Sequence, residues 1–172
     1  MSGTDVRTPM AGGAAMVRPL AWVWMGIVIG VSFLATPVKF TADSLTRPVA
    51  LDVGRATFHA LAYLEWSLVA VAAALSWHAT ARGHHLSRRA LTAAAVIVVA
   101  LALQSAWLLP ALDERVASII AGTEPPPSHL HTLYGVVEIT KVAALGLLGA
   151  WATPTATRSE SPTQTAAARV QP

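Results

Sequence analysis

The chain has 172 residues, of which 54% are hydrophobic and only 12% are charged. Soluble domains average about 25% charged residues, so this composition indicates an integral membrane protein. The chain contains no cysteine, which excludes disulfides, thiolate metal sites and thiol catalysis. The formal net charge is only +3, and the arginines are scattered around the apolar runs, which excludes the clustered basic face of a nucleic-acid-binding protein.

The first membrane span is predicted at residues 20–38, after a Gly/Ala/Thr-rich segment at 1–17 that we expect to be a disordered tail. A cleaved signal peptide is an alternative for this run. However, the run exceeds the usual apolar length of about 7–15 residues, and Pro37 lies where cleavage would occur. We therefore expect a retained membrane anchor.

Three further apolar runs have the length of a membrane span: residues 56–78, 90–112 and 132–152. A short amphipathic helix is predicted to begin at Pro48 and to run directly into the second span. Another is predicted at 113–121 and ends before the triple proline at 125–127. Residues 153–172 are rich in Thr, Ser, Pro and Ala and are predicted to be a second disordered tail.

These runs predict an all-α fold, an integral membrane four-helix up-down bundle formed by residues 18–152. Most of the six tryptophans lie near the ends of apolar runs, which is typical of an interfacial aromatic belt. Gly26 and Gly30 form a Gly-x-x-x-Gly motif, and Gly146 and Gly149 lie late in the fourth span. These small residues predict close helix packing, within the bundle or in a dimer.

The distribution of basic residues predicts the orientation in the membrane. With four spans, both termini and the middle loop lie on one side. That side carries seven lysines and arginines, namely Arg7, Arg18, Arg82, Arg88, Arg89, Arg158 and Arg169, against four on the other, Lys39, Arg47, Arg55 and Arg115. The positive-inside rule then favours a bacterial inner-membrane location with both termini in the cytoplasm.

Polar residues inside three spans are predicted to lie at a common depth, in the outer half of the bundle. At about 1.5 Å per residue, Glu65, Gln104, Glu138 and Lys141 all fall about 8–13 Å from the outer ends of their spans. Tyr134, Glu138 and Lys141 also share one face of the fourth helix. Because charges are costly in hydrocarbon, we expect these side chains to turn inward and to pair.

Two readings of this cluster stay open. It could simply hold helices together, since such links contribute about 0.6 kcal/mol each. Alternatively, because two carboxylates share one ammonium, it could bind a proton, a cation or a small polar ligand, with Glu65, Gln104, Tyr134, Glu138 and Lys141 as the candidate residues.

Metal or haem ligation is a third reading, in which His59, His129 and His131 at the outer rim supply three nitrogens. No ligand motif fixes their spacing, so we predict no cofactor, while a haem or a divalent metal stays open. The sequence indicates no catalytic residue.

Four stretches resemble a known family. They are Gly30-x-x-Phe33-x-x-x-Pro37-x-x-Phe40, Gly54-Arg55-x-x-Phe58, Leu108-x-Pro110 and His131-x-x-Tyr134-Gly135-x-x-Glu138-x-x-Lys141. Over residues 22–149 the chain resembles the four-helix membrane proteins of domain of unknown function four-one-four-nine, which are similar to the transmembrane-protein-two-hundred-five group. This resemblance implies four spans and a membrane location, but no reaction and no catalytic residues.

The first functional hypothesis is therefore a membrane protein that binds a small ligand, a cation or a proton, or assists its transport. The second is a structural or partner-binding subunit, whose partners are the lipid bilayer and either a second copy or another membrane protein. An enzyme or redox carrier ranks last of the three.

Overall fold

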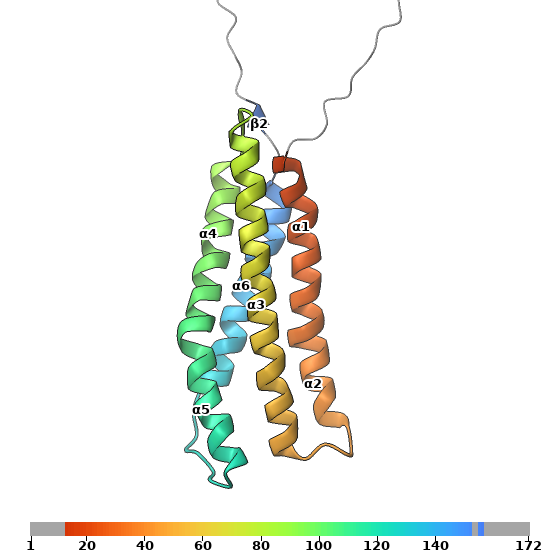
Figure 1. Cartoon of the computed structure of the whole chain (residues 1–172), viewed down its shortest axis with the longest axis vertical. Coiled ribbons are helices and arrows are strands. Elements are labelled where there is room, and N and C mark those ends of the chain that lie inside the picture. Colours follow the sequence, from red (N-terminus) through yellow and green to blue (C-terminus); the bar gives the residue numbers. More distant parts are fainter. Residues whose placement is uncertain (1–12, 153–154, 157–172) are drawn as a thin grey trace, which may run out of the picture.

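The computed structural model describes residues 13–152 and 155–156 and consists of four long helical segments side by side (Figure 1). The first contains α1 (Gly13–Val28), the π-helix η1 (Ile29–Ala35), α2 (Thr36–Val38) and the 3-10 turn η2 (Lys39–Thr41). The second is a single helix, α3 (Arg47–Thr80). The third contains α4 (Arg88–Leu103), the π-helix η3 (Gln104–Leu108) and α5 (Leu109–Ile120), and the fourth is α6 (Leu130–Trp151).

All four segments are long and apolar enough to cross a membrane: Ala15–Thr41, Arg47–Thr80, Arg88–Ile120 and Leu130–Trp151. The predicted all-α four-helix membrane bundle is therefore confirmed. Neighbouring segments run in opposite directions, so that α1 begins and α6 ends at the same end of the bundle (Figure 1). We call this the terminal end, and the end with the connections 42–46 and 121–129 the far end.

The helices begin and end where the sequence gives a local reason. Pro48 lies in the first turn of α3. N–H groups in the first turn have no acceptor within the helix, so the proline there costs no helical hydrogen bond. The Ser87 side chain accepts a hydrogen bond from the Ala90 N–H and caps α4. After α3 and α5, Gly83 and Gly122 take positive φ angles of 79° and 80°, which few residues other than glycine adopt.

The spans are longer than predicted. Both short amphipathic helices are present, and each is continuous with its span, as predicted for the one that begins near Pro48. Thus α3 begins at Arg47 and the third segment ends at Ile120. The predicted N-terminal tail is too long, because α1 already begins at Gly13 and Val17 is buried in the core. The other tail residues, 1–12 and most of 153–172, lie outside the described residues; within the second tail, β2 (Thr155–Ala156) pairs antiparallel with β1 (His84–His85).

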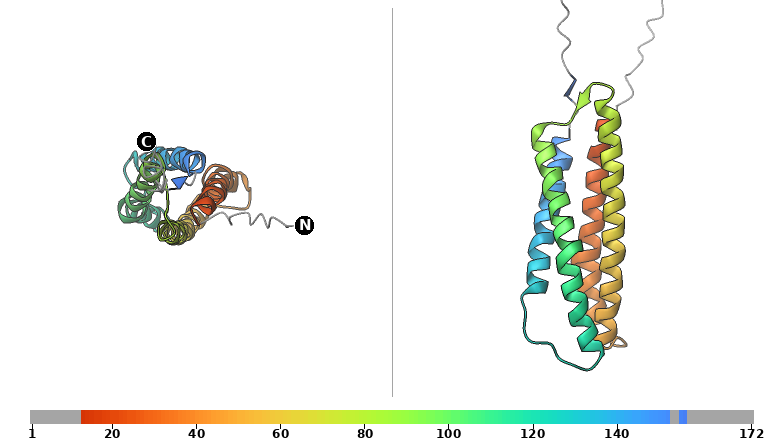
Figure 2. Two further views of the ribbon diagram at one scale, coloured as in Figure 1. Left: turned by 90° about the horizontal axis from the view of Figure 1, so that it is seen from above. Right: turned by 60° about the vertical axis from the view of Figure 1, so that its left-hand side comes forward.

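Viewed along its axis, the bundle has α6 packed against α1 and α4, and α3 packed against α1 and α5 (Figure 2). Helices α3 and α6 are therefore diagonally opposite. An apolar core near the terminal end is built around Trp24, Ile97 and Leu145. A smaller one near the far end contains Leu108, Leu109 and Tyr134. The residues between these two layers are polar.

The expected interfacial belt does not include Trp24, which is buried between helices. Gly26 and Gly30 bring no helices close within this chain, because a Cβ added at either position would meet nothing within 4 Å, and their use in a dimer stays a prediction. Gly149 does bring helices close, as a Cβ there would lie 2.7 Å from the Trp22 indole.

Candidate functional site

Lys141 of α6 is the centre of a buried set of hydrogen bonds in the middle of the bundle. Its Nζ lies 2.7 Å from Glu65 Oε2, 2.8 Å from Gln104 Oε1 and 3.0 Å from Glu138 Oε2. Each of the four side chains belongs to a residue that is at most 1% exposed. Lys141 therefore donates two hydrogen bonds, to Glu65 and Gln104, and forms an ion pair with each glutamate.

The first span adds the donors that complete both carboxylates. Trp24 Nε1 donates to Glu65 Oε1 at 2.9 Å, and Ser32 Oγ donates to Glu138 Oε1 at 2.6 Å. Gln104 Nε2 donates to Glu138 Oε2 at 2.5 Å. Every span therefore contributes to one group of six residues, which we call the polar network: Trp24, Ser32, Glu65, Gln104, Glu138 and Lys141.

Two π-helical turns supply the side chains that donate to Glu138. Ser32 lies in η1 and Gln104 begins η3, and a proline follows shortly after each turn, Pro37 and Pro110. A proline has no N–H for the carbonyl four residues earlier, which favours a widened turn before it. In both turns a backbone N–H bonds five residues back, from Thr36 to Val31 and from Leu109 to Gln104.

The network holds more negative than positive groups. It contains two carboxylates, Glu65 and Glu138, and one ammonium, Lys141, so it carries a net charge of −1 when all three are ionised. Across residues 13–152, no other cationic side chain forms an ion pair with it. Burial makes such an excess costly, so a bound proton or cation would stabilise the network.

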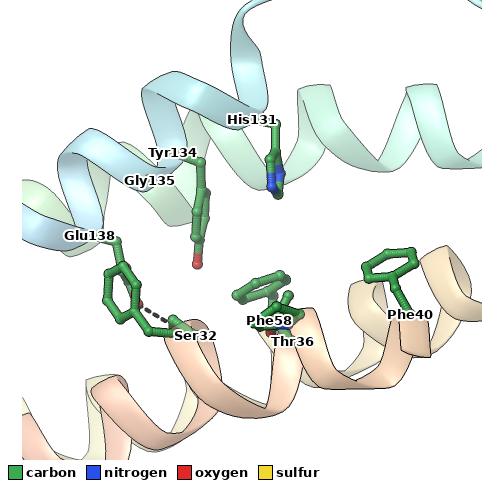
Figure 3. Close-up of a pocket in the computed structure, with 10 residues that line it drawn as sticks. Ser32, Thr36, Phe40, Phe58, His131, Tyr134, Gly135 and Glu138 are labelled. Carbon is green, nitrogen blue, oxygen red and sulfur yellow. Dashed lines mark hydrogen bonds between the residues drawn. The ribbon is translucent and has the colours of Figure 1, made fainter. Parts of the chain in front are cut away.

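A cavity of about 380 Å³ reaches the network from the far end (Figure 3). One wall is formed by η1, α2 and η2, the other by the first turns of α6, and Phe58 of α3 closes the side. Glu138 and Ser32 lie at its inner end, while His131 and Phe40 lie nearer the far end (Figure 3). Glu138 is thus both part of the buried network and one of the residues that line the cavity.

The structure brings together four of the five predicted site residues, Glu65, Gln104, Glu138 and Lys141. These four residues lie nearer the middle of their helices than the predicted outer-half depth. Glu65, for example, lies 18 residues after the first residue of α3, Arg47, and 15 before its last, Thr80. Tyr134 is placed beside the network rather than in it. Its ring packs against Phe58 with centroids 5.0 Å apart, and it lines the cavity. The role of all five stays a prediction.

The three rim histidines are not gathered into one site. His59 Nε2 lies 2.7 Å from Asp113 Oδ2 on the neighbouring α5, whereas His129 and His131 are exposed on the first turn of α6. In the described part of the chain, no group of three His, Cys, Asp or Glu side chains is placed to hold a metal ion. The geometry therefore does not support the predicted three-nitrogen site.

Sequence reasoning missed Trp24 and Ser32, because the first span has no charged residue and was treated as apolar throughout. The signal that could have found them is the position of Ser32 five residues before Pro37, which matches Ser105 before Pro110. This spacing marks a π-turn in each span, and such turns often carry functional side chains.

A family model described as "Domain of unknown function (DUF4149)" matches residues 20–119, which is more than half of the chain. The chain belongs to this family. The DUF4149 match covers the first three spans with Glu65 and Gln104, and it ends before α6, so the motif from His131 to Lys141 lies beyond it. The similarity to the transmembrane-protein-two-hundred-five group stays a prediction. No curated protein and no solved structure matches the chain.

Proposed function

We propose that this multi-pass membrane protein binds a proton or a small cationic ligand at Glu138. The proposal rests on one observation: Glu138 belongs to a buried network with an excess negative charge and is also one of the residues that line a cavity. A group that neutralises Glu138 from the cavity side removes that excess without breaking the contacts of Lys141 to Glu65 and Gln104.

Infrared difference spectroscopy on the protein in lipid nanodiscs tests this proposal. We expect the C=O stretch of a buried carboxylic acid to appear when the proton binds and to disappear when it is released. Glu138→Gln should remove this band, whereas Glu114→Gln, at an exposed position on α5, should retain it. An identical titration in the wild type and in Glu138→Gln would contradict the proposal.

A structural role is the second candidate, and one observation favours it. Lys141 contacts three polar groups, and every oxygen of both carboxylates accepts a hydrogen bond from a protein side chain, so the carboxylates need no ligand to satisfy their hydrogen bonds. In this case the infrared band does not titrate, and replacing Glu138 and Lys141 together by apolar side chains leaves a folded bundle when Glu65→Gln is added, so that no carboxylate stays buried without its counter-charge. Such a subunit would join a second copy or another membrane protein, which native mass spectrometry would detect.

The proposed location is the bacterial inner membrane with both termini in the cytoplasm, supported by the seven-to-four distribution of basic residues. The far end of the bundle, where the cavity reaches His131, then faces the outside. A metal or haem role ranks last. Unit stoichiometry of a metal, or haem absorption, in the purified protein would promote it.

A further inference from the structure

The cavity beside Glu138 has an unusual composition for this chain. There are only three phenylalanines in the sequence, Phe33, Phe40 and Phe58, and all three line this cavity together with Tyr134. Its volume of about 380 Å³ is within the range of about 300–1,000 Å³ that is typical of small-molecule sites. The phenylalanines of the chain are thus all next to the excess negative charge.

The cavity is open on the side that faces lipid. Phe33 and Phe40 are 43% and 51% exposed although they lie within the first membrane span. In Figure 3 the helix that carries Ser32, Thr36 and Phe40 is separated from α6 by the space into which His131 and Tyr134 point. A ligand that partitions into the bilayer can therefore reach Glu138 between these two helices, without crossing the apolar core.

The lining selects for a positive ligand. Glu138 is the only carboxylate among the lining residues, and no lysine or arginine is among them. The Phe40 ring already has a cation beside it, because Lys39 Nζ lies 5.1 Å from its centroid. Aromatic faces attract cations, and an arrangement of several rings around a carboxylate is typical of sites for organic ammonium groups. An anion would instead meet the excess negative charge of the network at close range in a poorly screened setting.

The Tyr134 hydroxyl adds a polar contact that no protein group uses. Tyr134 is 5% exposed, and no hydrogen bond from its hydroxyl to another described residue is formed. Ser32 and Thr36 also line the cavity, and each already donates its hydroxyl hydrogen, to Glu138 and to the Val31 carbonyl. Their oxygens remain able to accept, so ammonium hydrogens would find acceptors as well as a counter-charge.

From these observations we infer that the cavity binds an amphiphilic organic cation, an amine or quaternary ammonium with an apolar body, which reaches it laterally from the bilayer. The ammonium lies at Glu138, and the apolar body lies between Phe33, Phe40 and Phe58. This inference rests on the proposed function and names the ligand class of the same site.

Equilibrium binding of tritiated decyltrimethylammonium to the protein in zwitterionic nanodiscs tests the inference. We expect saturable binding at one site per chain above the partitioning into empty nanodiscs. Unlabelled decyltrimethylammonium should compete, while decyl sulfate, with the same chain and the opposite charge, should not. Competition by decyl sulfate, or binding equal to that of empty nanodiscs, overturns the inference.

Two variants with matched controls locate the site. Glu138→Gln should weaken binding about tenfold or more, equivalent to about 1.4 kcal/mol, and Glu114→Gln at an exposed position should not. Phe58→Leu should weaken it about threefold by removing one aromatic face, whereas Tyr63→Leu, 73% exposed on the same helix, should have no effect. If Glu138→Gln does not fold, the Phe58 pair decides, and unchanged affinity in Phe58→Leu contradicts the assignment.

The two proposals fail in different ways. A titrating infrared band without saturable decyltrimethylammonium binding leaves the proton site standing and refutes the organic cation. Saturable binding that Glu138→Gln does not weaken refutes both the role of Glu138 and the assignment of the cavity.

Discussion

Lys141 and Glu65 are 76 residues apart in the sequence, yet Lys141 Nζ lies 2.7 Å from Glu65 Oε2. Their helices, α6 and α3, are diagonally opposite in the bundle (Figure 2). The ion pair therefore crosses the bundle axis and connects two helices that are not neighbours in the bundle. Gln104 and Trp24, from the remaining spans, complete the connection.

Removal of the ammonium alone should be strongly destabilising. Lys141→Met leaves Glu65 and Glu138 buried together without a counter-charge, and we expect a loss of about 3–5 kcal/mol in the free energy of unfolding. Unfolding in mixed micelles with increasing SDS measures this loss. The double variant Glu65→Gln/Lys141→Met removes one charge of each sign and should lose markedly less, because Glu138 keeps the donors Ser32 and Gln104. Equal losses in both variants would contradict this account.

The existence of the cluster was predictable because its charged members each carry a strong signal alone. Glu65, Glu138 and Lys141 are conspicuous in apolar runs, and the helical rise places them at one depth. The neutral members carry no such signal, since Ser32 and Trp24 are ordinary residues in a membrane span. Their participation depends on where π-turns and neighbouring helices place them, and this is a property of the assembled bundle.

The cavity could not be predicted for a related reason. A phenylalanine in a membrane span can contact lipid, pack in the core or contact a ligand. Only the separation of the first span from the start of α6 shows that Phe33, Phe40 and Phe58 line a cavity. The length of the third segment was also underestimated, because the polar residues at 113–120 conceal that α5 continues to Ile120 without a break. Hydropathy detects the apolar part of a helix and not its ends.

The indole of Trp24 should contribute to stability through its hydrogen bond as well as through packing. Trp24→Phe keeps most of the apolar volume but removes the donor to Glu65 Oε1, and a hydrogen bond to a charged group contributes about 1.5–3 kcal/mol. Trp66→Phe is the matched control, because Trp66 is 38% exposed and its Nε1 donates to the neutral Ser105 hydroxyl at 3.1 Å. Thermal unfolding in detergent compares the two, and an equal shift in both variants would show that the Glu65 bond adds nothing specific.

Two glycines should respond in opposite directions to the same substitution. Gly→Ala inside a helix is normally stabilising by about 0.8–1 kcal/mol. Gly26→Ala should show this gain, since the added Cβ meets nothing within 4 Å. Gly149→Ala should instead lower the unfolding temperature, because the Cβ would lie 2.7 Å from Trp22 Cε2 and the indole would have to move. A higher unfolding temperature in both variants would mean that the Trp22 side chain can move aside without destabilising the bundle.

The orientation of the bundle can be tested without background labelling, because the chain has no cysteine. Asp43→Cys lies in the exposed connection at the far end, and Arg82→Cys lies in the turn after α3 at the terminal end. The basic residues near the terminal end predict that this end is cytoplasmic. In intact cells a membrane-impermeant maleimide should therefore modify Asp43→Cys at once and Arg82→Cys only after permeabilisation. The reverse pattern would place the His131 end of the cavity in the cytoplasmic half of the membrane, and the ligand would then enter the site from that leaflet.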